Sequence, residues 1–165
     1  MTKKKYAKRQ PKRTRVSEQE IIYSPFTSKQ TRATITKDYI NEIKTAGNGA
    51  LANAIESLKE NNTILYFLEN LGYLPKDFDG SLLLPFLENK SSQIRFWAVK
   101  NLGKIEDVKY LQIISRVAKY DSDSSVRREA VSSIGRMRNP KNIQVLVELL
   151  KDPDPKILAQ AIRGL

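Results

Sequence analysis

The sequence predicts an all-α protein whose larger part, residues 62–165, is built from repeated pairs of helices. Apolar residues recur in it at helical spacing, and the same apolar columns return after 31 or 32 residues. Short alternating patterns typical of strands are missing. A helix pair of this kind buries its apolar face only against its neighbours, so the pairs are expected to stack into an α-solenoid.

Four segments carry the repeat, at 62–72, 93–103, 125–135 and 156–165. Their apolar positions coincide when the segments are aligned, and in the last three segments one column holds only alanine, as two closely packed helices require. The first column is Leu71, Leu102, Ile134 and Leu165, the second is Leu68, Val99, Val131 and Ile162, and the small one is Ala98, Ala130 and Ala161.

Second apolar helices are expected between these segments, each followed by a polar turn. The turns supply Asp, Asn and Ser residues that cap the next helix through their side-chain oxygens. The helices are predicted at 82–87, 111–118 and 143–150, and the turns at 89–92, 121–124 and 152–155.

The chain before the repeats divides into two further parts. Residues 1–20 are rich in Lys and Arg and poor in apolar residues, which predicts a disordered basic arm. Residues 21–61 begin as an irregular segment and continue into two short helices. Thr36 caps the first helix, which runs to Ala46; residues 47–49 stop it, and the second covers 50–59.

The repeats resemble the HEAT repeat class. The features that carry the resemblance are an acidic turn at Asp121, then Val126-Arg127, then Ala130, then Ile134-Gly135. It implies that Arg95 and Arg127 bridge to the acidic turn of a neighbouring unit. The first unit departs from the pattern, as a capping unit would, and the last stops inside its first helix, so we expect a piece of a longer protein.

The composition excludes several kinds of chemistry. There is no cysteine and no histidine, which removes disulfides, thiol nucleophiles, Cys-based zinc sites and histidine acid–base catalysis. No catalytic residue or cofactor is predicted. No metal site is predicted either, because the three acidic pairs that could hold a metal ion lie in inter-helix turns, where Asp caps helices. The pairs are Asp77 with Asp79, Asp121 with Asp123, and Asp152 with Asp154.

No signal peptide or membrane-spanning run is found, which predicts a cytoplasmic protein.

Positive charge is concentrated at the start of the chain, where eight Lys and Arg residues precede the first acid, Glu18, in a protein of formal net charge +11. Clustered cations bind nucleic-acid phosphates by releasing counterions. Six further cations on polar faces or in turns of the repeats are candidates for the same surface. The predicted nucleic-acid-binding residues are Lys3, Lys4, Lys5, Lys8, Arg9, Lys12, Arg13, Arg15, Lys100, Lys104, Arg128, Arg136, Arg138 and Lys141.

We therefore predict a non-catalytic binding module for a nucleic acid, with DNA as the first expectation. Arm, linker and repeats together resemble the front of some bacterial DNA methyltransferases, which implies a place in a larger DNA-modifying protein. The alternative is a protein–protein scaffold that binds a peptide or helix on its concave face. A third reading, an enzyme subunit similar to HEAT-like bilin lyases, has no reactive residue to support it.

Overall fold

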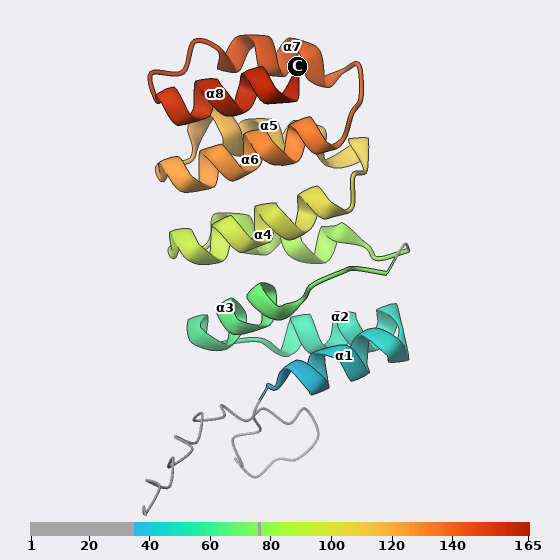
Figure 1. Ribbon diagram of the computed structural model, residues 1–165. Helices are drawn as coiled ribbons and strands as arrows, with labels where there is room; N and C mark the ends of the chain where they lie inside the picture. The colour runs from blue at the N-terminus through green and yellow to red at the C-terminus, as the bar shows by residue number, and fades with distance from the viewer. Residues whose placement is uncertain (1–34, 76) are drawn as a thin grey trace, which may run out of the picture.

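The computed structural model describes residues 35–75 and 77–165, and the predicted basic arm lies outside this part. The described residues form helices and turns without a strand, which confirms the all-α fold class. Figure 1 shows the helices stacked one on another, from α1 and α2 at one end to α7 and α8 at the other. One apolar core runs through the whole stack.

The first helix pair forms where the sequence predicts it. Helix α1 spans Lys37–Ala46, and the Thr36 hydroxyl accepts a hydrogen bond from the Tyr39 N–H at 3.1 Å. Gly47 ends this helix at φ 100°, a conformation that favours glycine. It also precedes α2, Asn48–Ser57, directly. The second helix therefore starts two residues earlier than expected, because Gly47 alone makes the turn.

The four repeat segments form one layer of helices. In this layer α3 packs against α4, α4 against α6, and α6 against α8 (Figure 1). We call it the repeat layer. Its helices are α3 Asn61–Asn70, α4 Ser92–Lys104, α6 Ser124–Arg136 and α8 Pro155–Gly164.

The intervening apolar segments form the second layer. The segment predicted as a helix at 82–87 is a 3₁₀ helix, η1, and not an α-helix. Pro85 inside it has no N–H to donate to the preceding turn, which disfavours the α-helical hydrogen-bond pattern. The short 3₁₀ helix η2 leads into α5. The elements are η1 Gly80–Glu88, η2 Val108–Tyr110, α5 Leu111–Tyr120 and α7 Asn142–Leu149.

The alignment of the repeats correctly identifies the part of the core that the repeat layer contributes through its columns. Every column member in α3, α4 and α6 is fully buried, as are the three alanines. Ile162 and Leu165 are the exceptions, at 59% and 56% exposure, so their prediction as core residues is wrong. Ile162 lies in α8 and Leu165 directly follows it, and in the described part of the chain no later repeat helix packs against α8.

Candidate nucleic-acid interface

The structure describes six of the predicted binding residues; the eight in the arm, Lys3 to Arg15, lie outside the described part. Lys100 and Lys104 belong to the C-terminal half of α4, and Arg136 is the last residue of α6. Arg138 and Lys141 are exposed in the turn between α6 and α7. The sixth, Arg128, lies nearer the start of α6 and lines a hollow with Asp154 and Lys156.

Two lysines bind the C-terminal end of α3. The Lys104 ammonium donates to the Gly72 carbonyl and to the Asn101 side chain, both at 2.9 Å. Lys44, in the last turn of α1, donates to the Leu71 carbonyl at 2.8 Å. The final carbonyls of a helix lack partners within it, so positive groups are favourable there. Lys44 is not among the residues that the sequence predicts for this surface.

Arg136 occupies the position of Lys104 one repeat later. Its guanidinium donates to Ser133 at 2.8 Å, Ser132 at 3.1 Å and Glu129 at 2.9 Å. Its side chain is 37% exposed, so part of the charge reaches solvent although Glu129 offsets some of it. Arg136 is thus held in one place by its own helix.

These cations lie close enough to influence one another. Burial of the Lys104 ammonium lowers its pKa, and the like charges of Lys100, Arg136 and Lys44 lower that pKa further. Burial also lowers the pKa of Lys44. We call Lys44, Lys100, Lys104 and Arg136 the basic cluster. A bound anion would relieve the repulsion within it.

Aromatic side chains adjoin the basic cluster on α4. The Lys100 ammonium lies 4.3 Å from the centre of the Trp97 ring and 5.6 Å from that of Phe96. The two rings meet edge to face, with centres 5.7 Å apart and planes at 87°. Both side chains are half-buried.

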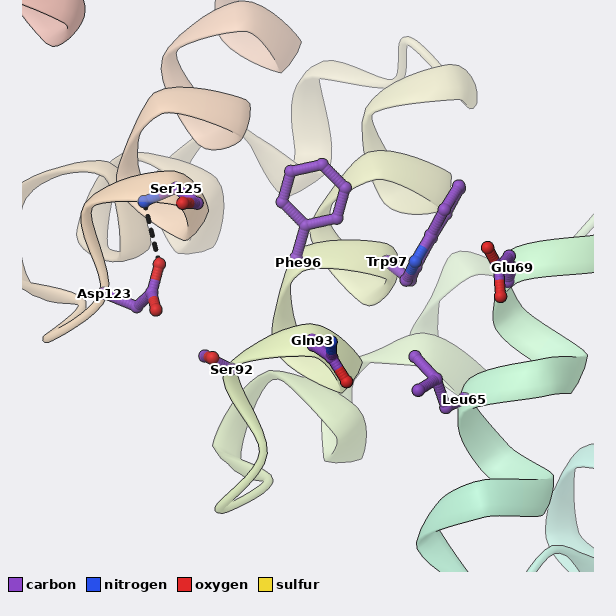
Figure 2. A pocket seen from close by; sticks show the side chains of 8 residues that line it. All are labelled: Leu65, Glu69, Ser92, Gln93, Phe96, Trp97, Asp123 and Ser125. Atoms are coloured by element: carbon purple, nitrogen blue, oxygen red, sulfur yellow. Dashed lines mark hydrogen bonds between the residues drawn. The ribbon is translucent and has the colours of Figure 1, made fainter.

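A groove of about 440 Å³ opens beside these rings, on the repeat layer between α3, α4 and α6. Figure 2 shows Trp97 between Phe96 and the α3 residues Leu65 and Glu69, with Asp123 on the far side of Phe96. We call it the aromatic groove. Its lining residues are Leu65, Glu69, Ser92, Gln93, Phe96, Trp97, Asp123 and Ser125.

Comparison with known proteins identifies the repeats. A family model described as HEAT repeats matches residues 111–165, which contain α5 to α8. Residues 111–165 therefore match HEAT repeats in sequence. A comparison with curated proteins gives no match.

The expected arginine contacts of the HEAT repeats are present. Arg95 on α4 makes two hydrogen bonds of 2.8 Å to the carboxylate of Asp121, in the turn before α6. Arg127 repeats the contact one unit later, with its Nε 3.9 Å from an Asp152 oxygen. Each arginine also donates to carbonyls of the turn that precedes its own helix, so it joins two successive turns; the acceptors include Asn89 and Asp121.

The acidic residues of the turns have structural roles. Asp123 and Asp154 accept hydrogen bonds from the first N–H groups of α6 and α8, and Asp79 does the same for η1. Within residues 35–75 and 77–165, no group of three or more potential metal ligands is found. None of the helices in that part is long and apolar enough to cross a membrane. The capping acids thus lie at the N-terminal ends of the repeat helices, whereas the basic cluster lies toward the C-terminal ends.

Proposed function

We propose that these HEAT repeats are a non-catalytic recognition module that holds the phosphate backbone of a nucleic acid, DNA in the first instance. The observation that carries the proposal is the basic cluster, in which α1, α4 and α6 bring four cations together at one edge of the stack. Phosphate contacts of this kind fix the position of a duplex without reading its sequence.

The distribution of positive charge along the protein supports an extended polyanion as the ligand. The basic cluster lies toward the C-terminal ends of α1, α4 and α6, and the arm adds eight cations from Lys3 to Arg15. Counterion release from a nucleic acid grows with the number of phosphates contacted, so separate groups of cations add to the affinity. In a larger DNA-modifying protein, such as a methyltransferase, this edge would position DNA for the catalytic domain.

Charge-removing substitutions test the proposal. The variant with Lys44, Lys100 and Lys104 replaced by Gln should bind a duplex roughly tenfold or more weakly at low salt, because three phosphate contacts are lost. Glutamine keeps an N–H donor near the α3 carbonyls, so the fold should persist, and circular dichroism checks this. Fluorescence anisotropy with several unrelated duplexes should show the same loss for each.

A matched control removes three charges from the opposite edge. Lys59, Lys90 and Lys151 are exposed and lie in the turns before α3, α4 and α8. Their replacement by Gln lowers the net charge equally but should leave most of the affinity. An equal loss from both triple variants would show that net charge alone attracts the duplex and that the basic cluster is not the site.

A protein partner is the second candidate, because one end of the stack is apolar. Ile143 and Val147 on α7 are 54% and 47% exposed, and Ile162 of α8 and the Leu165 that follows it are exposed as well. Exposed apolar side chains grouped on one face are typical of protein contacts. Binding through this end face would depend little on salt, whereas phosphate binding weakens steeply as salt rises.

A further inference from the structure

The aromatic groove has the chemistry of a site for a cation. Two carboxylates, from Glu69 and Asp123, and two aromatic rings line it, and none of its lining residues is basic. A cation is attracted to the face of a Trp or Phe ring, and a carboxylate accepts its hydrogen bonds. The surface therefore complements an Arg or Lys side chain, whose apolar stem can also cover Leu65.

The neighbouring Lys100 shows that these rings accept a cation. Its ammonium lies over both Trp97 and Phe96 without being one of the residues that line the groove. An incoming cation would meet some repulsion from Lys100. The two carboxylates of the groove outnumber that one charge, so the local balance still favours a positive ligand.

The Asp123 carboxylate is charged at neutral pH. Burial raises the pKa of Asp123, but hydrogen bonds from the N–H groups of Ser125 and Val126 outweigh it and hold that pKa below its usual range. Glu69 is exposed and forms no salt bridge within the described part of the chain. Its charge is therefore available to a ligand.

We propose that the aromatic groove binds an Arg or Lys side chain from the protein's own basic arm, Lys3 to Arg15. The arm carries eight cations and no acid, which matches the charge of the groove. Its tether is long enough, because the 20 residues from Arg15 to Ile35 can span roughly 60 Å when extended. The groove lies about two helices from α1, on the order of 20 Å away.

This contact goes beyond the proposed nucleic-acid binding. An arm residue in the groove cannot bind a phosphate at the same time, so the groove holds the arm on the repeat layer until a nucleic acid competes for it. The contact between arm and groove forms without nucleic acid, and the experiment that tests it contains no nucleic acid. A negative result would therefore leave the basic cluster unaffected as a proposed phosphate site.

Trp97 reports directly on the groove because it is the only tryptophan of the chain. Its fluorescence should be quenched less by acrylamide in the full chain than in a chain that starts at residue 17. A synthetic peptide of residues 1–16, added to the shortened chain, should restore the protection and reach saturation. The same peptide with every Lys and Arg replaced by Gln should not.

Two substitutions in the shortened chain locate the contact. Glu69→Gln should weaken the affinity of the shortened chain for the peptide roughly fivefold, the change expected for loss of one partly exposed ion pair. Glu56→Gln removes an exposed charge of α2, away from the groove, and should leave peptide affinity unchanged. Equal quenching of the full and shortened chains, or equal peptide affinity for the two variants, would overturn the proposal.

Discussion

Replacing Gly103 by alanine is expected to destabilise the protein by about 3 kcal/mol, at the upper end of the cost of overpacking a core. A Cβ at this position would lie 2.2 Å from the Ser133 hydroxyl oxygen and 2.4 Å from the Ser133 Cβ. Ser133 is fully buried, so α4 and α6 would have to separate. Urea unfolding followed by circular dichroism measures the loss.

Gly49 is the matched control for this substitution. It lies inside α2, and a Cβ there would meet nothing within 4 Å. Gly49→Ala should therefore stabilise the protein by about 0.5–1 kcal/mol, the ordinary gain from replacing a helical glycine. Adding Ser133→Gly to the Gly103→Ala variant should recover much of the loss. If the Gly103→Ala variant is as stable as the Gly49→Ala variant, the close packing of α4 on α6 is contradicted.

The second large effect is expected at the buried arginine contact between successive turns. The side chains of Arg95 and Asp121 are only 12% and 6% exposed. Asp121→Ala should destabilise the protein by about 3 kcal/mol, because it leaves a buried guanidinium without its carboxylate. It also removes the hydrogen bond from the Asp123 N–H. Thermal or urea unfolding gives the difference.

An exposed ion pair provides the comparison. Arg116 on α5 pairs with Glu88 at the end of η1, and both side chains are more than half exposed. Glu88→Ala should change the stability by at most about 0.5 kcal/mol, since water already solvates and screens this pair. Similar losses from Asp121→Ala and Glu88→Ala would mean that the Arg95 contact does not join the repeats.

The repeat pattern made much of the fold predictable. Because the columns return every 31 or 32 residues, they locate the buried faces of α3, α4 and α6. The bridging roles of Arg95 and Arg127 are instead implied by the resemblance to HEAT repeats. They also place Lys104 and Arg136 at equivalent helix ends, where neighbouring repeats bring them close. Ile162 and Leu165 are exposed, unlike the earlier residues of their columns, because a column residue is buried only where another helix covers it.

The remainder of the site depends on contacts outside the repeat pattern. Lys44 joins the basic cluster because α1 packs near the end of α3, a contact between residues 27 positions apart that periodicity does not encode. The aromatic groove combines Glu69, Trp97 and Asp123 from three units, each of which has an ordinary role in its own segment. The partial neutralisation of Arg136 by Glu129 was also missed, since it depends on side-chain conformation.

The salt dependence of duplex binding tests the central proposal most directly. Log affinity should fall linearly with log salt, with a slope of about 0.9 per phosphate contacted. The variant with Lys44, Lys100 and Lys104 replaced by Gln should give a shallower line, by up to about 2.7, if each lysine contacts one phosphate. The variant at Lys59, Lys90 and Lys151 should keep the slope of the unmodified protein. Three parallel lines would contradict a phosphate-binding role for the basic cluster.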